Sequence, residues 1–117
     1  MKTISKILLV RAPYARLIVQ GLKTWEMRST ATNIRERIGI AEVGSGLIIG
    51  EVDLVDCLGS DTNSILYSNL AKHRVFPLSL LWKWNVPWVL KNAVEYKEPK
   101  PYDHPRGAVI WVKVGEQ

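Results

Sequence analysis

Cysteine, histidine and long apolar runs are all scarce in this chain, and each shortage excludes a class of protein. The single cysteine, Cys57, cannot form an internal disulfide, and two separated histidines give no spacing typical of metal ligands. We therefore expect no metal and no other cofactor. No apolar stretch approaches the roughly 20 residues of a membrane-spanning helix, and Arg11 and Pro13 end the first apolar run too early for a signal peptide. We expect a cytoplasmic protein without a membrane partner.

Acidic residues are also in the minority. The chain has 16 Lys and Arg against 11 Asp and Glu, a formal net charge of +5, which favours anionic partners such as nucleic acid. A net charge of about 2 to 8 is also ordinary for the solubility of a small domain, so the charge alone supports both interpretations. The 117 residues fit a single domain, 1–117, and leave both a monomer and a weak dimer open.

Apolar periodicity predicts short strands and two helices. We expect strands at 4–10, 24–28, 37–41, 47–58, 88–96 and 108–114. A bend is expected at Gly50 and a bulge between 90 and 93. We expect helices at 13–20, ending at Gly21, and from a cap at 59–62 to about Ala71, with a helical turn at 77–81. Three prolines at 97–107 predict an extended loop. The fold class is therefore α+β: a small mixed β-barrel of five or six strands with one or two covering helices.

Two adjoining motifs resemble the signature of the ASCH domain family. They are 12–15 (APYA), at the start of the first predicted helix, and 21–29 (GLKTWEMRS), after it. The second contains the family pattern glycine-x-lysine-threonine-x-glutamate-x-arginine, and weaker similarity extends over nearly the whole chain. The resemblance implies a PUA-like barrel, a cleft between the first helix and the barrel, and a role in RNA-related processes. Glu36 departs from a frequent glycine and could bring a negative charge near the cleft, and Tyr14 replaces a frequent tryptophan.

The second motif also has a physical interpretation of its own. Thr24, Glu26 and Arg28 share one face of a strand that Trp25 anchors to the core, and Lys23 begins it. Arg28 can bind a phosphate with two hydrogen bonds, while Glu26 holds the cations in place or accepts a proton from a base. Ordinary cross-strand pairs are the alternative. For an RNA or nucleotide-like ligand, the expected binding residues are Pro13, Tyr14, Lys23, Trp25, Glu26, Arg28, Ser29, Thr32, Arg35 and His104.

A small metal-independent hydrolase is the alternative function. The resemblance includes ribonucleases and amidohydrolases that act on acetylated cytidine. In such a site Lys23 would be the base, Thr24 would supply a hydroxyl and Glu26 would move the proton. The amidohydrolases also use a glutamate from a later helical segment, but residues 64–75 contain no acid, and Asp61 is the nearest substitute. We therefore place RNA or nucleotide binding first.

Three residues outside the motif complete the expectations. Among the tryptophans, Trp84 is expected to be exposed enough to stack on a base. His73 lies between Lys72 and Arg74, which predicts a basic surface patch that touches phosphates. His104, in a loop between prolines, is either a general acid or base or an exposed bystander.

Overall fold

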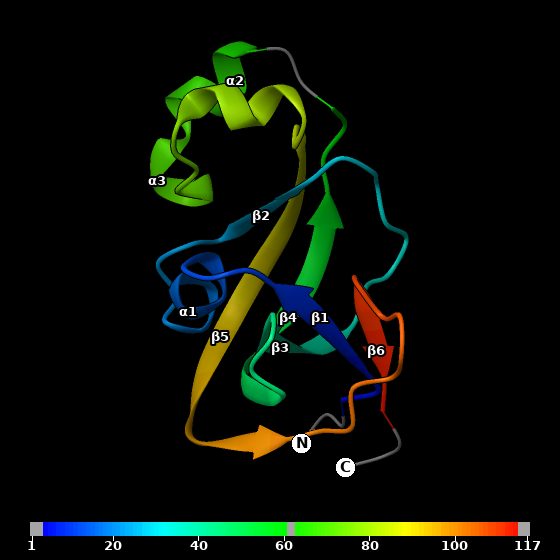
Figure 1. Cartoon of the computed structure of the whole chain (residues 1–117). Helices are drawn as coiled ribbons and strands as arrows, with labels where there is room; N and C mark the ends of the chain where they lie inside the picture. Colours follow the sequence, from blue (N-terminus) through cyan, green and yellow to red (C-terminus); the bar gives the residue numbers. More distant parts are fainter. Residues whose placement is uncertain (1–3, 61–62, 115–117) are drawn as a thin grey trace.

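A computed structural model describes residues 4–60 and 63–114. Its six strands form one mixed sheet in the order β2-β5-β4-β3-β1-β6 (Figure 1). Their bounds are Lys6–Val10 (β1), Trp25–Arg28 (β2), Arg37–Glu42 (β3), Leu47–Cys57 (β4), Val86–Pro101 (β5) and Trp111–Lys113 (β6). Only β1 and β3 pair in parallel within these residues. The sheet curls into a half-barrel with β2 and β6 at its edges, so the predicted α+β fold with a small mixed barrel is confirmed.

The first helix, α1 (Tyr14–Val19), packs against the sheet, mainly over β4 and β5. Ala15, Ile18 and Val19 are its buried residues. The helix lies so close to β4 that a Cβ atom on Gly50 would be 2.5 Å from Val19 Cγ1. The pairing register shifts between Ile48 and Gly50, which confirms the irregularity expected there.

Gly21 ends the first helix as predicted. It has φ +78°, a left-handed conformation that glycine adopts without strain. The N–H groups of Gly21 and Leu22 donate to the carbonyls of Ile18 and Leu17, each at 3.0 Å, in the pattern of a Schellman motif. The same Leu17 carbonyl accepts from Lys23 N at 3.1 Å. The turn therefore fixes the position of Lys23, just before β2 begins.

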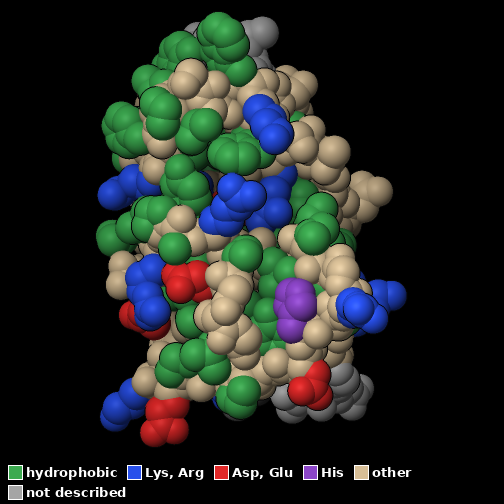
Figure 2. All heavy atoms as spheres, viewed as in Figure 1, with side chains coloured by type: hydrophobic (Ala, Val, Ile, Leu, Met, Phe, Trp, Pro, Cys, Tyr) green, Lys and Arg blue, Asp and Glu red, His purple; other side chains and the backbone are tan. Residues whose placement is uncertain are grey.

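Residues 63–85 form a helical cap over β2 at one end of the sheet (Figure 1). It contains α2 (Asn63–Ser68), α3 (Leu70–His73) and a 3₁₀ turn, η1 (Leu78–Trp82). Leu66, Val75 and Leu81 pack with Trp25 and Met27 in one buried cluster, which confirms that the core lies under these two β2 side chains. Figure 2 shows hydrophobic side chains gathered over this end of the molecule.

The prediction of one helix up to about Ala71 is wrong, because the segment breaks at Asn69. The Asn69 amide donates to Ile65 O at 2.7 Å, and its backbone (φ −118°) begins α3. Such side-chain bonds to the backbone compete with a continuous helix. The predicted cap at 59–62 lies partly outside the described residues. No helix in the described ranges is long and apolar enough to cross a membrane.

The expected loop at 97–107 is also partly wrong, since β5 continues to Pro101. Beyond Val89, β5 pairs with β4 but no longer with β2. Backbone N–H groups on one side then need no strand partner, and proline is tolerated at such edges. The bulge expected between 90 and 93 is confirmed: the β4–β5 register shifts there, and Asn92 has φ +56°.

Candidate functional site

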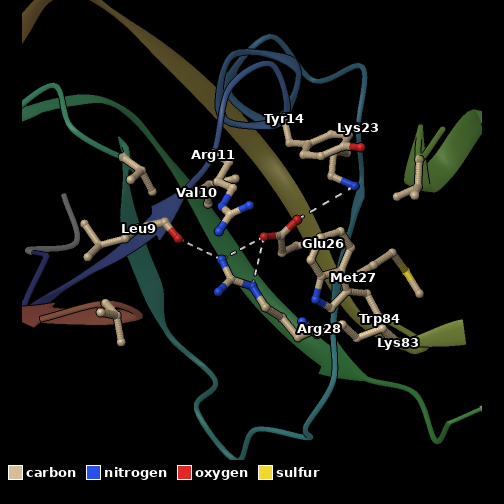
Figure 3. Close-up of a pocket in the computed structure, with 13 residues that line it drawn as sticks. Leu9, Val10, Arg11, Tyr14, Lys23, Glu26, Met27, Arg28, Lys83 and Trp84 are labelled. Carbon is tan, nitrogen blue, oxygen red and sulfur yellow. Dashed lines mark hydrogen bonds and ion pairs between the residues drawn. The ribbon is translucent and has the colours of Figure 1, made fainter. Parts of the chain in front are cut away.

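A cavity of about 260 Å³ opens where β1 ends beside α1, β2 and the cap (Figure 3). Its charged lining consists of four cations and one carboxylate, and two aromatic rings complete its walls. Cations and carboxylate are Arg11, Lys23, Arg28, Lys83 and Glu26; the rings belong to Tyr14 and Trp84. The lining is therefore both strongly positive and aromatic.

Lys23 is the most deeply buried of these cations. Its side chain is 1% exposed, its Nζ donates to the carbonyl of His73, and Glu26 Oε1 lies 3.8 Å away. The ammonium also lies 5.0 Å from the centre of the Tyr14 ring. Burial lowers the pKa of Lys23 to about 8, with Glu26 opposing the shift and the Arg28 charge adding to it. The amine is thus a cation near neutral pH that loses its proton more readily than an exposed lysine.

Glu26 and Arg28 form the centre of the site. Glu26 Oε2 accepts a hydrogen bond from Arg28 Nε at 3.0 Å and forms an ion pair with Arg28 Nη2 at 2.8 Å. The same Nη2 donates to the carbonyl of Leu9, in β1, at 2.8 Å. Figure 3 shows Lys23 and Arg28 turned toward the carboxylate from opposite sides. Glu26 is therefore engaged by two cations, and Arg28 connects β2 to β1.

Arg11 and Lys83 are the two exposed cations of the lining. Arg11 is exposed, and within the part of the chain that the structure describes its side chain makes no hydrogen bond or ion pair. Lys83 is also exposed, with its Nζ 5.7 Å from the Trp84 ring centre. Among the described residues, neither the Arg11 guanidinium nor the Lys83 ammonium is paired with a carboxylate, so both can approach an anion at the cavity without breaking an ion pair.

The ASCH domain family model matches residues 8–100, which include every residue of the cavity lining except Val109. The chain belongs to the ASCH domain family. Its structure is similar to the crystal structure of ASCH from Zymomonas mobilis, with a TM-score of 0.73 and 15% sequence identity over 94% of this chain and 87% of that one. Structures of two single-substitution variants of that protein give the same TM-score and identity, covering 87% and 89% of their chains. Among curated proteins, none matches the sequence.

At this identity the structural similarity establishes the ASCH, PUA-like fold. The resemblance inferred from segments 12–15 and 21–29 is therefore confirmed. In this ASCH domain the two motifs meet at the cavity, because α1 and the Gly21 turn bring Tyr14 and Lys23 to the same wall.

Four predicted site residues, Tyr14, Lys23, Glu26 and Arg28, line the cavity together. Trp25 lies beneath them in the buried cluster shared with the cap, and Lys72 Nζ sits 5.0 Å from its ring centre. Pro13 is exposed just before α1 and is not part of the lining. Thr24 lines a smaller cavity of about 90 Å³, which it shares with Lys23.

The other predicted residues lie outside the cavity lining. Ser29 is exposed, and Thr32 Oγ1 accepts from Ile34 N at 3.1 Å. Arg35 donates to the carbonyl of Thr32 at 2.8 Å, so this loop folds back on itself. His104 lies near Ala108 O at 3.0 Å and Tyr102 Oη at 3.1 Å, within its own loop.

Glu36 brings no charge to the cavity lining. Its carboxylate accepts hydrogen bonds from Ser5 Oγ at 3.0 Å and Lys6 Nζ at 3.3 Å instead. Across residues 4–60 and 63–114, no three His, Cys, Asp or Glu side chains come together as metal ligands would.

The prediction that His73 belongs to a basic surface patch is wrong. His73 is fully buried, its Nδ1 accepts from Val75 N at 3.0 Å, and its Nε2 lies 2.7 Å from Leu66 O. Because Nδ1 accepts a hydrogen bond, the ring is neutral and Nε2 is the donor to Leu66 O, which holds α2 against the rest of the cap; burial lowers the pKa of His73, in agreement with this. Trp84 is half-buried at the cavity, while Trp82 is the exposed tryptophan, at 75%.

Sequence reasoning missed Arg11 and Lys83 as site residues. The available signals were weak: Arg11 directly follows a buried strand, and Lys83 lies between two tryptophans. Trp88 and Trp111 stack on each other with ring centres 5.9 Å apart.

Proposed function

We propose that this ASCH domain binds single-stranded RNA, or a nucleotide-like ligand, by taking one nucleotide unit into the cavity. The observation that carries the proposal is the combination of four cations, one carboxylate and two rings around about 260 Å³. This volume lies just below the range of about 300 to 1,000 Å³ for small-ligand pockets. It suits one nucleotide, whereas a duplex has no unstacked base to insert.

Different residues of the cavity lining bind different parts of the nucleotide. Arg11 and Lys83 meet the phosphate, because neither is committed to a carboxylate among the described residues. Tyr14 and Trp84 offer flat faces for the base. Arg28 and Lys23 hold Glu26 in place, so that polar groups of the base meet a preformed surface. Membership of the ASCH family supports nucleic-acid ligands in general.

The test compares two variants that change the net charge equally. Affinities for a fluorescent single-stranded RNA and for a mononucleotide are measured at about 50 and about 200 mM salt. Arg11→Ala should weaken RNA binding about fivefold and reduce the salt slope by about one. Lys97→Ala removes an exposed cation from β5 and should change neither. If both variants weaken binding equally, attraction to the overall charge explains the result and the cavity proposal fails.

Hydrolysis of an acetylated cytidine is the second candidate, favoured by one observation. A lysine whose pKa is lowered to about 8 can act as a general base near neutral pH. Against it, Glu26 is bound to Arg28, and Thr24 lies outside the cavity lining. Incubation of N-acetylcytidine with the wild type and with Thr24→Val, followed by chromatography, separates the candidates. Turnover that Thr24→Val abolishes would favour the hydrolase; unchanged substrate favours binding.

A further inference from the structure

The helical cap, residues 63–85, contains two lysines and one arginine but no acidic residue. Lys72, Arg74 and Lys83 are all exposed. Arg74 Nε donates to Ala71 O at 3.0 Å, and its two Nη groups have no partner among the described residues. The cap surface is therefore positive, with no carboxylate of its own to balance it.

The cap also exposes large apolar side chains, two of them aromatic rings that are mostly uncovered. Trp82 is 75% exposed and Phe76 is 64% exposed, and Ile65 and Tyr67 add to the same cap. Figure 2 shows that hydrophobic side chains dominate this end of the view, above a band of Lys and Arg side chains. A tryptophan usually buries most of its large surface in a folded protein, so these rings are available to an outside partner.

Two of these exposed rings are next to cavity residues in the sequence. Phe76 directly follows Val75, and Trp82 directly precedes Lys83; Val75 and Lys83 both line the cavity. The segments that carry the rings therefore also reach the cavity, and they combine cations with exposed rings, as in proteins that bind unpaired bases and their phosphates.

We propose that the cap is a second subsite for single-stranded RNA, on which nucleotides next to the one in the cavity stack on Trp82 and Phe76. Arg74 and Lys83 contact the intervening phosphates. The cap itself carries cations and exposed rings but no acidic residue, and a polyanion with flat bases complements both features. The proposal rests on the proposed function, because the cavity anchors the strand.

The experiment measures affinity against ligand length by fluorescence anisotropy, from a mononucleotide to an RNA of about eight nucleotides. The wild type should bind the longer RNA more tightly. Trp82→Ala should lose about 5-fold to 100-fold of the affinity for the longer RNA, as expected for one stacked base, and less than about twofold for the mononucleotide. Trp82→Phe should restore most of the loss. Val94→Ala, which trims an exposed apolar side chain on β5, is the control and should change neither affinity.

The outcomes separate this proposal from the one it rests on. If the mononucleotide binds and the longer RNA binds no tighter, or if Trp82→Ala has no effect on it, the cap subsite is overturned and the cavity stands. If the wild type binds neither ligand, both proposals fail. If Trp82→Ala abolishes self-association in sedimentation and leaves RNA affinity unchanged, the cap joins two copies of the chain. Trp82 is largely exposed, so the melting temperature of the variant should equal that of the wild type.

Discussion

Two clusters of charged side chains occupy this sheet, and they are built differently: one surrounds a glutamate and the other an arginine. At the cavity, Glu26 faces both Arg28 and Lys23. On β3 and β4, Arg37 faces two carboxylates: its Nε lies 2.7 Å from Glu51 and its Nη1 lies 3.1 Å from Asp53. The first cluster has more cations than carboxylates, and the second has the reverse.

The second cluster also uses its remaining oxygens internally. Tyr96 Oη donates to Glu51 at 2.7 Å, and Asn92 Nδ2 donates to Asp53 at 2.9 Å. No cavity described for this chain is lined by Arg37, Glu51 or Asp53. The comparison shows that similar ion pairs serve two purposes. Both clusters join strands, but only the cluster around Glu26 also keeps an excess of positive charge at a cavity.

The largest expected difference between the clusters is in stability. Glu26→Gln leaves Lys23 and Arg28 without their buried counter-charge and should lower the free energy of unfolding by about 3 kcal/mol. Glu51→Gln should cost only about 1 kcal/mol, because its pair is more exposed and its partner keeps Asp53. Urea unfolding of both variants tests this. Equal losses would show that the two clusters are energetically alike.

The next difference is in ligand affinity. Arg28→Lys should weaken mononucleotide binding about tenfold, because a lysine cannot bind Glu26 and the Leu9 carbonyl in the same forked geometry. Arg37→Lys makes the same change in the other cluster and should leave affinity unchanged. Isothermal titration at one salt concentration gives both affinities. A comparable loss in the two variants would contradict the proposal that the ligand binds at the cavity and not at the Arg37 cluster.

The smallest difference is in pH dependence. Because the pKa of Lys23 falls from 10.5 to about 8 on folding, the unfolded chain binds its proton more tightly, and stability should rise with pH between these values. Mononucleotide affinity should instead fall about threefold as the pH rises through 8, since a positive charge is lost. Lys23→Met should show neither trend, whatever its affinity at neutral pH. An unchanged wild-type profile in Lys23→Met would assign the trend to another group.

Acid provides the matching measurement on the other cluster. Burial would raise the pKa of Glu51, but hydrogen bonds from Tyr96 and Arg37 outweigh it and lower the pKa below 4.5. This group therefore stabilises the fold above pH 4.5, and the contribution is lost as the pH falls through the lowered pKa. In Glu51→Gln the stability should decline less steeply in acid.

Local patterns carried most of the fold prediction. Alternation at 24–28 correctly placed Trp25 and Met27 in the core, and Gly21 correctly ended the helix, because periodicity and turn chemistry are properties of neighbouring residues. The central site residues Lys23, Glu26 and Arg28 were named from one short motif for the same reason.

Contacts between distant segments account for what was missed. Arg11 and Lys83 line the same cavity only because the cap packs beside the end of β1. His73 is buried because backbone groups of Leu66 and Val75 satisfy both its nitrogens, which a basic neighbourhood in the sequence cannot reveal. The prolines of β5 were misjudged because β2 is too short to pair with all of it.

The hydrogen bond from Lys23 to the carbonyl of His73 spans fifty positions of the chain. The same amine that lines the cavity therefore also connects β2 to the cap, and a neutral amine can still donate this hydrogen bond, although more weakly than an ammonium. A substitution at Lys23 consequently alters two properties together: the charge that a ligand meets and the seating of the segment that carries Trp84. Measurements on Lys23 variants become interpretable when cap order is followed beside them, for instance by hydrogen exchange across residues 63–85.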